Sequence, residues 1–320
     1  MATLPAQNTN KVDQLVTEAF FGGYFRYEPQ FPKIFKVIPP KQFNAKFSIW
    51  AGIGGPTATT TAGTYTGHDI TEVGSISVSQ QAYKDEISIP KGYAVFEHFG
   101  EIAESLVQLG LNYQVERDDV HARIFKNAFI STGGHGITIG GTATPLVSDT
   151  NRIGNTGLTF DNELATALST TQYGAAYQIF TRMVTHDNKS RPMMPALLVH
   201  TPNLHETVFQ LLRSPGDPTT ANRAENAWQG HVSSLEWPIL QVNNGGCDDT
   251  ANDTLAELQD NWFLLADKML TRFYSMESIA PKMTIIPSSE ATGARLYQFD
   301  MQIAAVAADW IGVVGSSGTA

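Results

Sequence analysis

The side chains that could bind a metal or act in catalysis are few in this chain, and their spacing argues against either role. Of the eight histidines, His200 and His205 form the only close pair. Metal-binding histidines on one helix face are about four residues apart, and this pair does not have that spacing. We therefore predict that His200 ends a strand, that His205 is exposed, and that the protein has no metal site.

An acidic cluster offers oxygen ligands from Asp248, Asp249, Asn252 and Asp253. It lacks the fixed spacing and the closing glutamate of an EF-hand loop, so a solvated turn is a better interpretation than a Ca²⁺ site. The adjacent Cys247 has no basic neighbour in the sequence that would stabilise a thiolate nucleophile. No G-x-S-x-G element is present either. We predict a protein that is not an enzyme and needs no cofactor.

The stretch from Gly133 to Gly157 contains seven glycines, which invites interpretation as a phosphate-binding loop. It has no Gly-Lys-Ser/Thr, and no G-x-G-x-x-G lies between a predicted strand and a predicted helix. We expect it to be a linker that turns several times between two domains.

Composition excludes several classes of protein. A chain of 320 residues with 42% hydrophobic content can bury a sizeable core, and 21 basic against 31 acidic residues argue against a broad nucleic-acid-binding surface. Neither a signal peptide nor a run of about 18 apolar residues is found, so we expect an unexported protein that does not span a membrane.

The element that would organise the chain is a very long helix over residues 93–131. Apolar residues recur there at helical spacing, glycines stand beyond its end, and no proline interrupts it. Such a helix would be roughly 58 Å long, whereas a compact globule of this chain length is only about 50 Å across. We predict a spine through an elongated subunit; the alternative is two core helices that bend at Gly110.

Before this helix we expect an arm and a hairpin. A short amphipathic helix ending at Gly22 and Gly23 precedes a proline-rich, aromatic stretch that suits neither a helix nor a central strand. Strands over 43–50 and 76–89 would form a ribbon around a glycine-rich tip at 51–67. A two-stranded ribbon is marginal alone, so this one should depend on contacts outside its own domain.

After the helix, the pattern predicts an α/β domain. A helix capped by Thr159 or Asp161 would run to Met183, the strand ALLVH would precede a helix opened by Pro202, and LEWPILQV and residues 262–266 would be strands. Residues 283–286 and 296–306 would form an antiparallel pair, followed by a Gly/Ser tail.

This order of parts resembles the tailed-phage major capsid protein, the HK-ninety-seven-type shell fold. ALLVHTPNLHETVFQLLRS resembles its strand, proline, helix unit, LEWPILQV its turn-proline-strand, and the stretch from WFLLADK to Trp310 its final passage between domains. WFLLAD and the GGYFRY to FPKIF region also resemble the Mu-like head-subunit branch. The resemblance implies an α+β fold with an extended arm (1–42), a long hairpin (43–90), a peripheral domain with the spine helix (91–132 and 270–320) and an axial domain (133–269).

The resemblance also implies a function and partners. The chain would assemble with itself into hexamers and pentamers of an icosahedral virion shell that encloses double-stranded DNA without sequence-specific binding. Portal, scaffold, protease or decoration proteins would be further partners, and assembly would occur in the host cytoplasm. Some family members crosslink a hairpin lysine to a neighbour's asparagine; Lys84 and Lys91 lie in that region, but no asparagine follows Ala294, so we predict no such crosslink.

Aromatic residues commonly anchor protein interfaces, so residue type suggests which side chains contact a neighbouring subunit. The expected contacts are Phe31, Phe35, Phe43, Phe47, Trp50, Tyr65, Tyr83 and Lys84. Two alternatives stay open: an encapsulin-like nanocompartment of the same fold that encloses protein, and an α/β enzyme whose site residues are not recognised.

Overall fold

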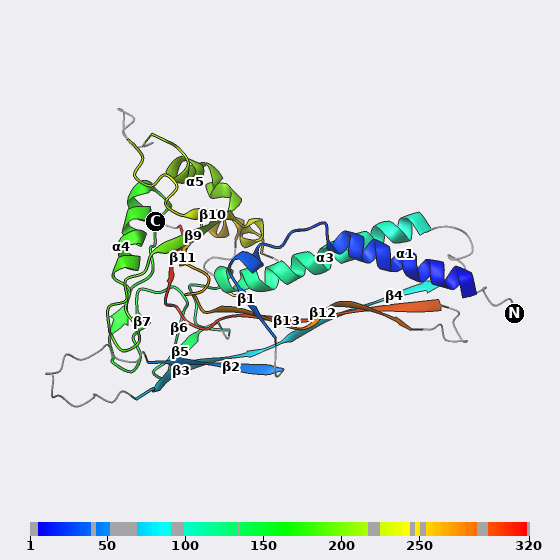
Figure 1. Ribbon diagram of the computed structural model, residues 1–320, viewed down its shortest axis with the longest axis horizontal. Helices are drawn as coiled ribbons and strands as arrows, with labels where there is room; N and C mark the ends of the chain where they lie inside the picture. The colour runs from blue at the N-terminus through cyan, green and yellow to red at the C-terminus, as the bar shows by residue number, and fades with distance from the viewer. Residues whose placement is uncertain are drawn as a thin grey trace, which may run out of the picture.

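The computed structural model describes residues 6–39, 43–51, 69–90, 99–133, 135–216, 225–243, 247–249, 254–286 and 294–318. The molecule is elongated (Figure 1). Helices and long strands lie along one axis, and a compact α/β unit stands at one end of them.

Helix α3, Phe99–Lys126, is the predicted spine, and it is unbroken in this range. It packs along α1, Ala6–Tyr24, which extends the expected short helix over most of the first part of the arm. The helix continues through Gly110 without the break that the alternative interpretation placed there. A Cβ there would lie 2.0 Å from the Phe20 carbonyl oxygen, and a Cβ at Gly23 would lie 1.9 Å from that of Val107. Both glycines are needed because the two helix backbones touch.

A four-stranded sheet lies beneath these helices in the order β1 (Lys36–Ile38), β12 (Phe273–Ile286), β13 (Ala294–Ala307), β4 (Gln81–Pro90). The antiparallel β12–β13 pair confirms the predicted pairing and extends it. Alternate residues of β13 bury Tyr297, Phe299 and Met301 against Val16 and Phe20 of α1. The long elements therefore form two layers, helices on a sheet.

The hairpin is partly as predicted. Strand β2, Asn44–Trp50, pairs with β3, Glu72–Ser79. On its other side β3 pairs with β5, Ile137–Ile139, which in turn pairs with β6, Thr142–Thr144. Residues 81–89 do not extend the ribbon, because after Gln80 the chain enters β4 and pairs with β13 instead. The predicted tip, 51–67, lies outside the described residues except for Ala51.

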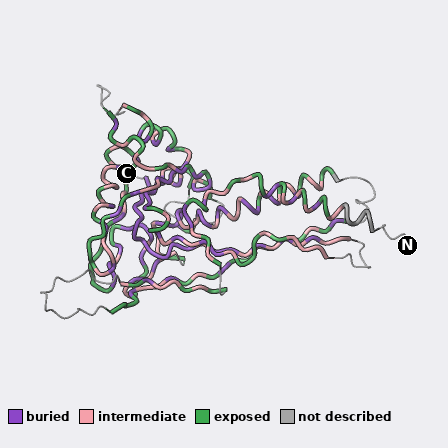
Figure 2. Tube along the Cα trace, viewed as in Figure 1, coloured by how far each residue is buried: buried purple, intermediate pink, exposed green. Residues whose placement is uncertain are grey.

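The axial unit is built on a second sheet of order β10 (Ser233–Glu236), β9 (Pro195–His200), β11 (Trp262–Ala266), β14 (Val313–Ser316). Around it lie β7 (Asn151–Arg152), β8 (Thr159–Phe160), α4 (Thr170–Thr181), α5 (His205–Leu212), α6 (Leu255–Leu258) and two 3₁₀ turns, η2 (Pro202–Leu204) and η3 (Pro238–Gln241). A further 3₁₀ turn, η1 (Phe31–Lys33), lies in the arm and contacts α3. Buried positions concentrate where this unit meets α3 (Figure 2).

Three predictions for this unit are wrong in detail. Thr159 lies in a strand, and the helix begins later because Ser169 caps it by accepting a hydrogen bond from the Gln172 backbone. LEWPILQV is a strand only to Glu236, since Pro238 starts a 3₁₀ turn. The expected C-terminal tail is the buried edge strand β14, which brings part of the predicted peripheral range into the axial sheet.

Two kinds of feature are absent from the residues that the structure describes. No helix among them is long and apolar enough to cross a membrane. No three of their histidine, cysteine or carboxylate side chains are grouped so that they could hold a metal ion.

Candidate functional site

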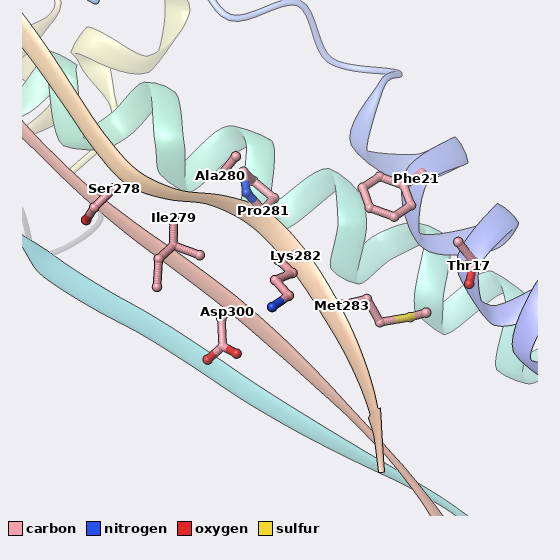
Figure 3. A pocket seen from close by; sticks show the side chains of 9 residues that line it. All are labelled: Thr17, Phe21, Ser278, Ile279, Ala280, Pro281, Lys282, Met283 and Asp300. Carbon is pink, nitrogen blue, oxygen red and sulfur yellow. The ribbon is translucent and has the colours of Figure 1, made fainter. Parts of the chain in front are cut away.

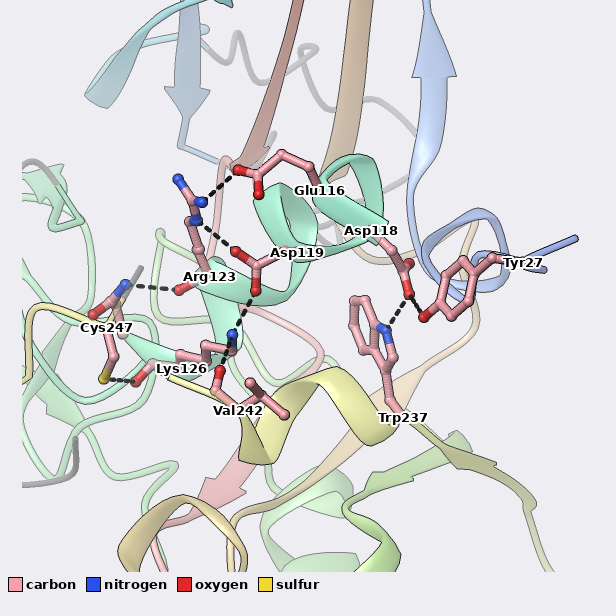
Figure 4. A network of polar contacts seen from close by, with 10 residues as sticks. Tyr27, Glu116, Asp118, Asp119, Arg123, Lys126, Trp237, Val242 and Cys247 are labelled. Carbon is pink, nitrogen blue, oxygen red and sulfur yellow. Dashed lines mark hydrogen bonds and ion pairs between the residues drawn. The ribbon is translucent and has the colours of Figure 1, made fainter. Parts of the chain in front are cut away.

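The clearest polar constellation joins the arm, the spine helix and the axial unit (Figure 4). Asp118 of α3 accepts hydrogen bonds from the Tyr27 hydroxyl (2.7 Å), the Gln30 and Phe31 backbone amides (3.0 Å each) and the Trp237 indole (2.8 Å). All four partners are donors, so the group that fits among them is the ionised carboxylate.

Burial and hydrogen bonding act in opposite directions on this carboxyl group. Removal from water raises the pKa of Asp118, and the four donated hydrogen bonds oppose that rise. Burial, together with the hydrogen bond to Asp118, raises the pKa of the Tyr27 hydroxyl, which therefore stays a donor. Three of the hydrogen bonds come from the arm and one from Trp237 of the axial unit, so together they hold both segments against α3.

His121, one turn further along α3, completes the attachment of the arm. Its ring stacks on Phe31 at a centroid distance of 3.7 Å and meets the edge of Phe35 at 4.8 Å. Nδ1 donates to the Arg117 carbonyl (2.7 Å), so Nε2 accepts from the Ser275 hydroxyl (2.8 Å). Burial lowers the pKa of His121 to about 3, which keeps the ring neutral.

A buried ion pair ties the last turns of α3 to the axial unit. Lys126 Nζ contacts Asp119 Oδ1 at 2.6 Å, and both side chains are fully buried. The same ammonium donates to the Val242 carbonyl at 2.6 Å, while Arg123 supplies a second cation to Asp119 at 2.9 Å. We call Asp118, Asp119, His121 and Lys126 together the junction.

Sequence reasoning missed the junction, because the charged residues of ERDDVHARIFK look like the solvent-exposed face of a helix. Asp118, Asp119, His121 and Lys126 are all at most 1% exposed. The available signal was the density of charge inside an otherwise helical, apolar pattern, since buried charges occur almost only in pairs.

Among the residues first considered for chemistry, the two histidines are placed as expected, whereas Asp249, expected in a solvated turn, is buried at 4% exposure. His200 ends β9, and burial lowers its pKa; His205 is exposed and lies 2.6 Å from Glu236. Cys247 donates weakly to the Lys126 carbonyl, and Asp248 pairs with His135 at 2.8 Å. Asn252 and Asp253 lie outside the described residues.

Two of the expected intersubunit contacts are explained within the chain itself. Phe31 and Phe35 are fully buried in the protein's own core, where both pack on His121. Their rings therefore have no surface to offer a neighbour, and we withdraw these two residues from the expected set.

The other expected contacts differ in exposure. Phe43 and Trp50 are 56% and 50% exposed, and Lys84 is also exposed. Phe47 is half-buried, because its ring stacks on Tyr274 at 5.1 Å. Tyr83 is half-buried and its pKa is raised to about 12, mainly by burial. Tyr65 lies outside the described residues. These remain predictions of contact.

A groove of about 800 Å³ opens between α1 and the edge of β12 that β1 leaves uncovered (Figure 3). Phe21 and Met283 form its apolar side, and Lys282 and Asp300 are its only titratable lining residues. The strand pairing is irregular here, around Pro281, which cannot donate a backbone hydrogen bond.

No protein-family model and no curated protein matches this sequence. Solved structures do match. The capsid of the cyanophage P-SCSP1u is 13% identical, with a TM-score of 0.57 over 91% of this chain and 88% of that one. The mature capsid of bacteriophage PhiM1 is 9% identical, with a TM-score of 0.53 over 91% and 87%.

A virus-like particle from Pyrococcus furiosus is also similar, at 6% identity and a TM-score of 0.50 over 95% of this chain and 98% of that one. At these identities the likeness concerns fold alone, and the Mu-like branch stays a prediction. The chain has the fold of the tailed-phage major capsid proteins, the HK-ninety-seven-type shell fold.

Proposed function

We propose that this chain is the major capsid protein of a tailed phage, a structural subunit that assembles into hexamers and pentamers of an icosahedral shell around double-stranded DNA. The observation that carries the proposal is the extent of the likeness: it spans 91% of this chain and most of each phage capsid chain. A structural role also agrees with the described residues, whose polar clusters position segments of the chain and do not surround a substrate site.

The net charge of −10 agrees with a DNA container. A surface that repels phosphate leaves a packaged genome free to move in and out. Shell partners such as a portal, a scaffold, a protease or decoration proteins, and assembly in the host cytoplasm, follow from the same proposal.

The hairpin is the first surface we assign to contact between subunits. Phe43 and Trp50 stand at the two ends of β2, and Ile70, two residues before Trp50's partner Glu72 on the returning chain, is 62% exposed. Large exposed apolar side chains at the ends of a protruding ribbon favour a role as anchors in a neighbour's pocket.

Electron microscopy and sedimentation of the purified protein test the proposal. We expect hollow particles or six-membered rings; a compact monomer at every concentration, even with a scaffold supplied, would contradict it. Phe43→Ser/Trp50→Ser should abolish assembly without changing the subunit's thermal unfolding. Phe25→Ser is the matched control, because Phe25 is 75% exposed but lies outside the hairpin.

The second candidate is a nanocompartment shell that encloses protein. The likeness to the Pyrococcus furiosus virus-like particle favours keeping it. Particles purified from the native host distinguish the two candidates: nuclease-protected DNA inside supports the phage head, and a co-purifying enzyme inside supports the nanocompartment.

A further inference from the structure

The axial unit carries opposite charges at two separated corners. One, the basic corner, consists of Arg182, Lys189 and Arg191, all exposed. Within the described residues none of these three cations has a carboxylate within 4 Å, although the chain has ten more acidic than basic residues (31 − 21). Asp187 lies in the same hairpin as Lys189, and Arg182 lines a groove with Asp161 and Glu163, so Lys189 and Arg191 are the cations most available to a partner outside the chain.

The basic corner is held rigidly. Lys189 lies in a tight hairpin closed by the Thr185 amide bonding to the Lys189 carbonyl (2.9 Å), and the Arg191 amide bonds to the Met183 carbonyl (2.8 Å). Inside this hairpin, buried His186 contacts Asp309 at 3.0 Å. Because Asp309 follows the end of β13, this contact fixes the hairpin to that strand. A preorganised surface loses little entropy when it binds.

The acidic corner consists of Glu206 and Glu236, both exposed. Glu206 lies in the first turn of α5, and Glu236 ends β10, where His205 holds its carboxylate at 2.6 Å. Neither glutamate has a lysine or arginine partner within 4 Å among the described residues.

The fold places these corners at opposite limits of one sheet. Glu236 lies on the edge strand β10, whereas the basic hairpin follows α4, which packs beside the other edge strand, β14. The basic residues also precede the start of β9, and the acidic residues follow its end. One subunit cannot pair its own corners, but two copies placed head to tail can.

We infer that the axial units of neighbouring copies meet head to tail, with Lys189 and Arg191 of one copy against Glu206 and Glu236 of the next. A contact between two different surfaces of the same chain closes into a ring when the rotation between copies allows it. The inference rests on the proposed shell function and names one contact between the subunits of that shell. DNA would explain the basic corner alone, whereas a second copy explains both. Complementary charge also fixes orientation and rejects misaligned partners.

Charge reversal and its compensation test this contact. We expect Lys189→Glu/Arg191→Glu and Glu206→Lys/Glu236→Lys each to raise the concentration needed for assembly by about tenfold or more. The quadruple variant, which carries both reversals, should return to near the wild-type value. Arg182 is left unchanged because it lines a second groove with Asp161 and Glu163.

The controls separate this inference from the shell proposal. All four side chains are exposed, so thermal unfolding of the unassembled variants should match the wild type, and Glu101→Lys/Glu104→Lys on α3 supplies the charge change of Glu206→Lys/Glu236→Lys elsewhere. Wild-type protein that never assembles contradicts the proposed function. Assembly by the wild type with unaffected double variants, or a quadruple variant no better than the doubles, overturns the head-to-tail contact alone. Normal shells of Lys189→Glu/Arg191→Glu that retain less DNA would also overturn it and assign the corner to phosphate.

Discussion

The two halves of helix α3 are held in different ways. Residues 99–114 bury apolar side chains such as Leu106 and Tyr113 against α1 and the long sheet, while Glu101, Glu104, Gln108 and Asn112 face solvent. Residues 115–126 bury the charged and polar groups of the junction. Apolar contact is non-directional, whereas a buried hydrogen-bonded network accepts one arrangement. The first half of α3 therefore holds α1 and the long sheet together by apolar packing. The second half fixes the positions of the arm and the axial unit.

The largest effect should come from breaking the buried ion pair. Lys126→Ala leaves Asp119 buried with only the partly exposed Arg123 beside it, and we expect a loss of about 3–5 kcal/mol in the free energy of unfolding. Denaturant unfolding of the unassembled subunit measures it. The double variant Asp119→Asn/Lys126→Met removes both charges and should recover much of the loss; a loss below about 1 kcal/mol for Lys126→Ala would show that the pair is not critical.

The next effect depends on pH. The pKa of folded His121 is about 3, below the ordinary value of 6.5, so the unfolded chain binds a proton that the folded chain does not, and stability falls as pH falls from about 6.5 toward 3. Between pH 7 and 5 this amounts to about 2 kcal/mol.

His121→Phe should remove that part of the pH dependence, measured as unfolding free energies of both proteins at pH 7 and 5. Asp118 has the opposite sign, because its raised folded pKa gives stability that is lost as pH rises through it. Lowered pKa values at His200 and His231 act equally in both proteins, so the difference isolates His121. Equal pH dependence would mean that His121 is accessible to protons.

A smaller effect tests the apolar half. Helix propensity alone makes Gly110→Ala stabilising by about 1 kcal/mol. The close approach of Phe20 predicts the reverse, a loss of about 1–2 kcal/mol as the helices separate. Gly100→Ala is the matched control on the same helix, since a Cβ there meets nothing within 4 Å and should be neutral or stabilising. Equal changes at both glycines would refute the backbone contact.

The smallest effect on stability is expected on the solvent-exposed face of α3. Gln108 donates to Asn112 at 3.1 Å in an exposed pair one turn apart. Gln108→Ala should change the free energy of unfolding by less than about 0.5 kcal/mol, and a larger loss in the unassembled subunit would show that this face is packed.

The same contrast explains what could be predicted from sequence. The apolar spacing of the spine, the alternation of β13 and the ALLVH and WFLLA strands follow local periodicity, and their elements were correct. The order of these elements also suggested the fold. Local pattern cannot show which distant segment lies beside a strand, so residues 81–89 were assigned to the hairpin although they pair with β13.

The candidate contacts were harder to predict because residue type does not reveal which surface is already occupied. Phe31 looked the same as Phe43 in the sequence, yet one stacks on His121 and the other is exposed. Gly110 looked like a weak point because the neighbour that requires a glycine, Phe20, is distant in the chain.

Helix α3 has 28 residues, which makes it about 42 Å long. The junction fixes one end of it beside the axial unit, and α1 and the long sheet hold the rest. Asp118 lies 19 residues, or about 29 Å, from Phe99, so a rotation of about 3° at the junction would shift Phe99 by about 1.5 Å. The relative orientation of the arm, the spine helix and the axial unit is therefore set by a handful of buried polar contacts.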